Sequence, residues 1–123
     1  MYKTVSQATL DALQGIDGPS ICNAIEGFNF RPKNQGFMMP EIQTAFKDFP
    51  PVVGYAVTGV ISANAPEGRN VAREDWWDLI VSVPEPRFIV LHDIDNPPIG
   101  AYWGEVQGNI HKALGAVGVA TDG

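Results

Sequence analysis

Apolar and polar positions alternate along the chain in blocks that predict three strands with helices between them. The β-branched run over 52–61 is mostly apolar, which is typical of a strand covered on both faces. Further buried strands are expected over 87–92 and 117–120. Apolar residues at helical spacing lie between the strands, over 71–83 and 104–114. This strand–helix–strand–helix–strand order favours an α/β fold with a mainly parallel central sheet, flanking helices and right-handed crossovers.

The first part of the chain predicts short helices followed by a long loop. A helix is expected over 6–13, and a second one from a Ser20 cap to Gly27. An irregular loop is expected over 28–40, and a short helical turn over 40–46. Because no repeat, low-complexity tract or linker interrupts the pattern, we expect a single domain over 1–123.

Composition narrows the class of protein and of partner. The 123 residues are 45% hydrophobic and 18% charged, which suits one modest core with part of the surface buried in an oligomer. The formal charge of −6 is not offset by any basic cluster, so nucleic acid is not expected as a partner.

The single cysteine, Cys22, rules out an intrachain disulfide and favours a reducing compartment. It lies in an apolar helical pattern and is expected to be a small core residue. No apolar run approaches the ~18 residues of a membrane span, and the N-terminus lacks the pattern of a signal peptide. We therefore expect a cytoplasmic protein with no membrane partner.

Polar residues gather where the predicted strands end. In open α/β sheets, ligands bind at the carboxyl ends of the strands. Asp93, Asp95, Asn96 and Glu105 follow the second strand and are expected near one pocket. The alternative is that Asp and Asn serve there as ordinary turn residues, which bond their own backbone.

The last third of the chain resembles a known family. The string Gly104-Glu105, Gly115, Gly118 and Asp122-Gly123 resembles the core motif of the RraA-like family. That family includes class II pyruvate aldolases acting on 4-hydroxy-4-methyl-2-oxoglutarate, oxaloacetate decarboxylases and the regulator of ribonuclease activity A. Its pattern is an acidic residue followed, roughly twenty residues later, by Arg-Asp. Glu105 fits the start, and the Arg-Asp pair is expected just beyond Gly123.

The resemblance implies roles for residues at the start of the last helix. Glu105 would orient water on a divalent metal, Mg²⁺ or Mn²⁺. The backbone at Gly104, Val106 and Gln107 would hold the carboxylate of a 2-oxoacid. The alternative for Glu105 is a first-turn glutamate that the helix dipole stabilises by ~0.3–1 kcal/mol.

Three further site residues are weaker candidates. Asn70 corresponds to a polar residue near the substrate in the family, although it would also suit an ordinary helix cap. Asp122 and Asp93 are possible metal ligands, although Asp122 lies in an Asp-Gly turn, where aspartate is common.

Two classes of function follow from this resemblance. One is a metal-dependent lyase that forms pyruvate, by aldol cleavage of a 4-hydroxy-2-oxoacid or by decarboxylation of oxaloacetate. The other is a non-catalytic regulator that binds a ribonuclease. A homotrimer or hexamer is expected in either case. Because the C-terminal Arg-Asp is missing, the chain is expected to be an incomplete RraA-like domain without activity of its own.

The remaining candidates for chemistry favour structural roles. His92 and His111 form no HxxxH pair and no Cys/His cluster, so a zinc site is not indicated. Trp76, Trp77 and Trp103 are expected in the core or in a subunit contact. Neither a GxGxxG loop after a strand nor a P-loop is present, so a nucleotide cofactor is not expected.

Overall fold

A computed structural model describes residues 3–65 and 70–123. The chain divides into two compact units: a helical unit, Val5–Val52, and a sheet unit, which comprises Val53–Gly123 and the N-terminal residues. Each unit is described by itself. None of the four helices within the described residues has the length and apolar character that crossing a membrane requires.

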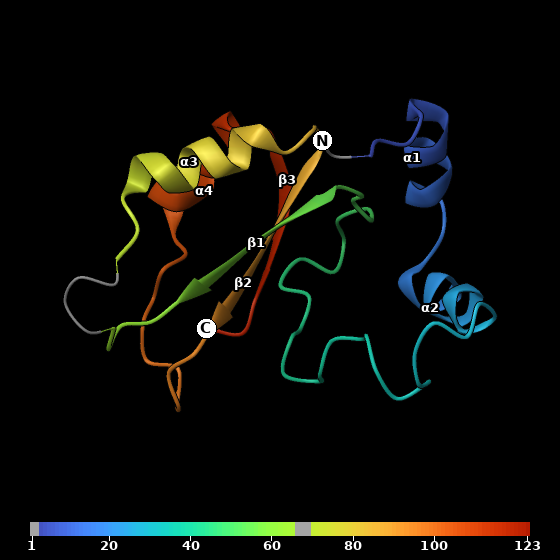
Figure 1. Ribbon diagram of the computed structural model, residues 1–123, viewed down its shortest axis with the longest axis horizontal. Helices are drawn as coiled ribbons and strands as arrows, with labels where there is room; N and C mark the ends of the chain where they lie inside the picture. Colours follow the sequence, from blue (N-terminus) through green and yellow to red (C-terminus); the bar gives the residue numbers. More distant parts are fainter. Residues whose placement is uncertain (1–2, 66–69) are drawn as a thin grey trace. The chain divides into compact units, whose positions relative to one another are not determined.

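The sheet unit is a three-stranded parallel sheet with two helices. Its elements in chain order are β1 (Tyr55–Ile61), α3 (Arg73–Ser82), β2 (Arg87–Asp93), α4 (Glu105–Ala113) and β3 (Ala116–Thr121). The strands lie in the order β1-β2-β3, with every pair parallel. Both helices lie on one side of the sheet (Figure 1), as two right-handed crossovers in the same direction require. The predicted α/β class with a parallel sheet and flanking helices is confirmed.

A small apolar core joins this sheet to its helices. It consists of side chains that are at most 4% exposed: Val57, Ile80, Val83, Ile89 and Leu91. Burying each of them contributes about 1.5–3 kcal/mol. The other face of β1 is exposed, with Val60 at 65%, so the expectation that this strand is covered on both faces is wrong.

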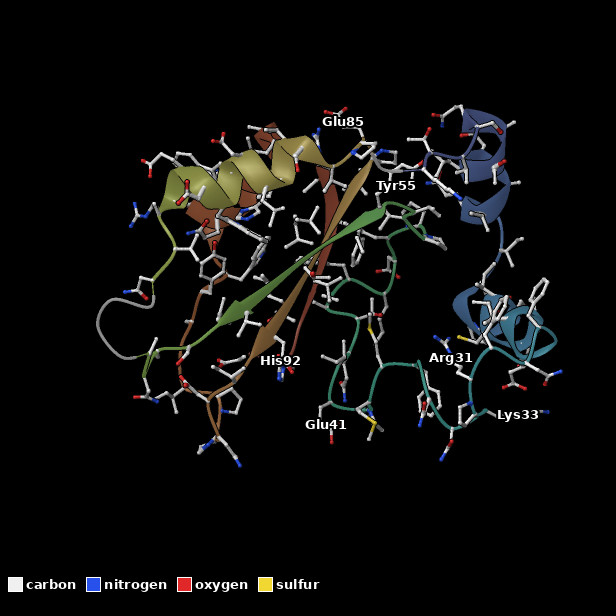
Figure 2. The ribbon with its side chains drawn as sticks, viewed as in Figure 1. Arg31, Lys33, Glu41, Tyr55, Glu85 and His92 are labelled. Atoms are coloured by element: carbon white, nitrogen blue, oxygen red, sulfur yellow. The ribbon has the colours of Figure 1, made fainter. Side chains whose placement is uncertain are left out.

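A buried cation holds the amino end of the sheet. Arg87, at the start of β2, donates to the carbonyl oxygens of Val81 and Val83 at the end of α3, and to that of Leu114 at the end of α4. It also pairs with Glu85, 2.9 Å away. Helix C-termini carry partial negative charge and unbonded carbonyls, so a cation there satisfies both helices at once. Figure 2 shows Glu85 at this end of β2 and His92 at the opposite end.

The beginning of α3 differs from its prediction. Asn70 is not its cap: the helix starts at Arg73, after Ala72, without a side-chain hydrogen bond at the cap. Glu74 and Asp75 in the first turn interact favourably with the helix dipole in place of a cap. The apolar spacing over 71–83 places Val81 on the same face as Trp77 and Ile80, but Val81 is 48% exposed.

The helical unit begins with two short capped helices. Helix α1 (Gln7–Gln14) is capped by Ser6, whose oxygen accepts from the Thr9 amide. Helix α2 (Gly18–Glu26) is capped by Asp17 and not by Ser20, which instead donates two hydrogen bonds to the Asp17 carboxylate. The cause is Pro19, which suits the first turn of a helix and moves the start of α2 ahead of Ser20.

Residues 27–52 of the helical unit contain no helix or strand. The helical turn expected over 40–46 is wrong, because this stretch contains no helix. It begins with an isolated turn, closed by the hydrogen bond from the Ile42 amide to the Met39 carbonyl. This segment exposes large apolar side chains at 57–82% of their surface: Phe28, Phe30, Phe37, Met38, Met39, Phe46 and Phe49. Cys22, expected in the core, is exposed as well.

Candidate functional site

One carboxylate ties together the carboxyl ends of β2 and β3. Asp122 Oδ1 accepts from the Asp93 amide at 2.7 Å, and its Oδ2 lies 2.6 Å from His92 Nδ1. The Asp93 amide and, to a smaller extent, the His92 ring hold the pKa of Asp122 below its usual value. The Asp122 side chain is therefore held by two hydrogen bonds. It joins two strands, which goes beyond the ordinary turn role that the Asp-Gly sequence also allowed.

Asp93 is the last residue of β2 and is only 6% exposed. Its Oδ1 accepts from the Asp95 amide at 2.9 Å. Its Oδ2 is buried and has no hydrogen-bond partner among the described residues. Gly123 packs against this carboxylate so closely that a Cβ there would overlap it. A buried carboxylate oxygen without a partner is costly, so Asp93 is the acid at this edge with capacity for a further ligand.

Asp95 holds the loop after β1 against the loop after β2. Its carboxylate accepts from Ser62 Oγ at 2.6 Å, the Ala63 amide at 2.7 Å and the Asn64 amide at 3.3 Å. These bonds, first of all that from Ser62, lower the pKa of Asp95. With its lone pairs used in this way, Asp95 is a structural clamp between the two loops.

The first turn of α4 begins without a side-chain cap. Gly104 stands at the cap position in extended backbone, and no side chain bonds to the amides that follow it. Free first-turn amides and the positive end of the helix dipole favour a bound anion. Val106 and Gln107 of this turn line a hollow of about 360 Å³ together with Arg73, the first residue of α3. Arg73 and two residues of the first turn of α4 thus line the same hollow.

Tyr102 lies where three hollows meet. It lines the 360 Å³ hollow at α4, a second hollow of about 230 Å³ whose wall includes Asp93, and a third of about 850 Å³ beside Asn70 and Trp76. Burial raises the pKa of Tyr102, so its hydroxyl stays protonated at neutral pH and can donate a hydrogen bond. The α4 turn and Asp93 therefore lie on adjoining cavities that share this tyrosine.

The predicted site residues are only partly brought together. Val106 and Gln107 lie in the hollow with Arg73, and Asn70 lines the largest hollow. Glu105 is exposed and makes no hydrogen bond or ion pair within the part of the chain that the structure describes. Its prediction as the acid that orients metal-bound water stays a prediction.

Arg73 and Tyr102, which line these hollows, and His92, which bonds Asp122, were not identified as site residues from the sequence. Arg73 and Tyr102 belong to no recognisable motif. The signals available were that Arg73 lies near the start of the helix before β2 and that Tyr102 lies just before the α4 turn, which could have suggested that both lie near this turn. His92 was dismissed because no second histidine lies near it in the sequence. Its partner, Asp122, is 30 residues away.

The acidic residues at the sheet edge do not form a metal centre by themselves. Within residues 3–65 and 70–123, no three His, Cys, Asp or Glu side chains lie close enough together to hold an ion. Both oxygens of Asp122 are bonded, which leaves Asp93 Oδ2 as the acceptor without a partner. The described residues thus offer one unpartnered carboxylate oxygen at this edge.

Comparisons with models of protein families, with curated proteins and with solved structures find no match for this chain.

Proposed function

We propose that the sheet unit binds the carboxylate of a 2-oxoacid and belongs to a pyruvate-forming lyase. The observation that carries this proposal is the uncapped first turn of α4, whose residues Val106 and Gln107 line the same hollow as Arg73. Two kinds of anion donor, backbone amides and a guanidinium, favour a small carboxylate there. The positive end of α4 and the charge of Arg73 act in the same direction.

The proposed chemistry is cleavage of a carbon–carbon bond, as in the aldol and decarboxylase reactions expected from the sequence. In both reactions, the electrons of the broken bond move to the 2-oxo oxygen and produce an enolate. Hydrogen-bond donors that face a developing oxyanion lower the barrier. Arg73 and the protonated Tyr102 are the donors that these cavities supply. Mg²⁺ or Mn²⁺ is the cofactor that the resemblance implies, and Asp93 Oδ2 is the unpartnered carboxylate oxygen that the described residues would offer it. A cytoplasmic location is part of the same proposal.

Binding can be tested directly with pyruvate. We expect the amide NMR signals of Val106 and Gln107 to shift as pyruvate is added. Arg73→Gln should weaken binding by about tenfold, the effect of losing one charge-assisted hydrogen bond of ~1.4 kcal/mol. Lys112→Gln, an exposed lysine in the last turn of α4, is the matched control and should bind as the wild type does. The proposed carboxylate site, the α4 turn together with Arg73, would be refuted by either of two results. One is pyruvate-induced NMR shifts that do not include the α4 turn, and the other is an Arg73→Gln variant that binds pyruvate as tightly as the wild type does.

Turnover is tested separately. Pyruvate release from oxaloacetate and from 4-hydroxy-4-methyl-2-oxoglutarate is followed with and without Mg²⁺ or Mn²⁺. This chain alone is expected to be inactive, so the variant is compared in a longer chain that carries the expected Arg-Asp pair. If Glu105 acts as the resemblance implies, Glu105→Ala should lower turnover there strongly and leave the circular dichroism spectrum unchanged. Normal turnover in that variant would remove Glu105 from the mechanism.

A second proposal is a protein-binding role, and the helical unit favours it. Its 27–52 segment exposes seven large apolar side chains, with the rings of Phe28 and Phe30 stacked at 5.7 Å and those of Phe46 and Phe49 at 5.1 Å. Exposed apolar clusters of this kind are typical of interaction surfaces. We propose that this surface mediates assembly into a homotrimer or hexamer, the arrangement expected for both classes of function. A monomer by light scattering at micromolar concentration would contradict it.

A further inference from the structure

His111 is a polar side chain buried where α3 and α4 meet. It lies on α4 and is 1% exposed. Its ring centroid lies 4.7 Å from that of Trp103, 6.2 Å from Trp76 and 6.3 Å from Tyr102. A titratable ring enclosed in this way by aromatic groups must satisfy both of its nitrogens internally.

The two hydrogen bonds of His111 fix its protonation state. Nδ1 lies 2.7 Å from the Gln107 carbonyl oxygen, which can only accept, so Nδ1 carries the hydrogen. Nε2 lies 3.0 Å from Trp76 Nε1, which can only donate, so Nε2 presents its lone pair. Neutral imidazole protonated on Nδ1 is the one form that makes both bonds. A second proton on Nε2 would face the indole N–H and break the bond to Trp76.

Within residues 3–65 and 70–123, no carboxylate bonds the His111 ring, whose two hydrogen-bond partners are Trp76 and the Gln107 carbonyl. The carboxylates that α3 contributes within these residues, Glu74, Asp75 and Asp78, make no bond to it. Helix α3 contributes Trp76 and, at its start, the cation Arg73; the segment before α4 contributes Tyr102 and Trp103. Helix α4 itself adds the exposed Glu105 and Lys112, and β3 has no titratable side chain. On β2, Arg87 bonds the ends of both helices, His92 pairs with Asp122, and the Asp93 carboxylate accepts from the Asp95 amide.

Trp76, His111 and the Gln107 carbonyl form a chain of two hydrogen bonds, which we call the clasp. Trp76 connects the clasp to the sheet. The Trp76 ring packs over Gly59 of β1, where a Cβ would lie 3.1 Å from the ring. Gln107, at the other end, belongs to the first turn of α4 and lines the hollow with Arg73. The contacts therefore run from β1 through Trp76 and His111 to Gln107.

We propose that His111 is the positioning residue of the α4 turn, and that it holds this turn in place only while its ring is neutral. The identity of the ligand, a small carboxylate, rests on the proposed function, whereas the clasp itself does not. Acid should release the turn, because protonation removes the bond that fixes it to Trp76 and the sheet.

The clasp is tested without any ligand. The amide NMR signals of Val106 and Gln107 are followed from about pH 8 to about pH 4.5, a range over which histidine side chains in proteins can change charge. The chain has two histidines, so His92→Gln is the matched control for His111→Gln. In His111→Gln the side-chain amide oxygen can accept from Trp76 but does not titrate. We expect one acid transition of these amides in the wild type and in His92→Gln, and none in His111→Gln. The carboxylates of Asp95 and Asp122 have lowered pKa values, so their titration falls below this window.

Two results would overturn the proposal: the same transition in His111→Gln, or an imidazole ¹⁵N spectrum that places the proton of His111 on Nε2. Pyruvate affinity then tests the consequence for the proposed carboxylate site. His111→Ala should bind pyruvate about tenfold more weakly than the wild type at neutral pH, whereas His92→Gln should bind it as the wild type does. Equal affinity in His111→Ala would refute the positioning role. If no variant binds pyruvate, the proposed function fails, while the amide titration still decides the clasp.

Discussion

Removal of the Arg87 guanidinium should destabilise the sheet unit more than any change to its exposed charges. The side chain is 10% exposed and donates to three main-chain carbonyls at 2.6, 2.7 and 3.2 Å, at the ends of α3 and α4. Hydrogen bonds to a charged group contribute ~1.5–3 kcal/mol each, and bonds that share one side chain are not additive. We expect Arg87→Met to lower the free energy of unfolding by about 3–5 kcal/mol, a large share of a typical total of ~5–15 kcal/mol.

The ion pair of Arg87 with Glu85 should contribute little of this. The Glu85 side chain is 68% exposed, so water screens the pair and Glu85→Gln should cost less than ~1 kcal/mol. Arg87→Lys retains the charge but cannot reach all three carbonyls from one ammonium, so we expect an intermediate loss.

Urea unfolding followed by circular dichroism measures the three variants against the wild type. If Arg87→Met does not fold, Arg87→Lys and Glu85→Gln still test the order of the effects. A loss below ~1 kcal/mol for Arg87→Met, with an unchanged slope against urea, would refute the reasoning. It would mean that water satisfies the helix carbonyls as well as the guanidinium does.

Two further predictions concern glycine and pH. A Cβ at Gly115, whose φ is +79°, would lie 2.5 Å from Arg87 Nη1, so Gly115→Ala should lower the free energy of unfolding by about 1–3 kcal/mol. Gly108 lies within α4 with open space around it, so Gly108→Ala should raise that free energy by ~0.5–1 kcal/mol. Equal effects of the two substitutions in urea unfolding would contradict this account. The pKa of Asp95 is lower in the folded state than its ordinary value of 3.8, so its contribution to stability is present above that pH and is lost as pH falls through the folded pKa. Hydrogen exchange should accordingly show the Ala63 amide protected at pH 5 in the wild type. The same amide should be unprotected at any pH in Asp95→Ala, whose side chain has no acceptor. Unchanged protection in the variant would show that another group holds the loop.

The regular elements could be predicted because their causes are local. Alternating and helical spacing of apolar residues located all three strands and both helices of the sheet unit to within a few residues. Gly115 marked the end of α4 because its left-handed backbone favours glycine. The caps were harder to predict. Asp17 and Ser20 are both good capping residues, and Pro19 between them decided which one the helix uses.

The site could be predicted only in outline, because its bonds join residues far apart in the sequence. Ser62 bonds Asp95 across 33 residues, and Trp76 bonds His111 across 35. No periodicity carries that information. The parallel topology did predict that Asp93 lies at the sheet's carboxyl edge and that the α4 turn follows from that edge, since such edges collect the loops. It did not predict that Tyr102 lines the cavities of both.

The parallel topology also gives the two ends of the sheet opposite electrostatic roles. Each helix runs antiparallel to the strands, so both helix C-termini lie at the amino end, where the Arg87 cation bonds their carbonyls. Both N-termini then point toward the carboxyl edge, and with them the positive ends of the helix dipoles. Despite a net charge of −6, the cavity at the α4 turn therefore has a positive helix end and Arg73 around it. The net charge of the whole chain disfavours a polyanionic partner such as nucleic acid. It says little about a single carboxylate, because that ligand is bound by a field that extends over only one helical turn.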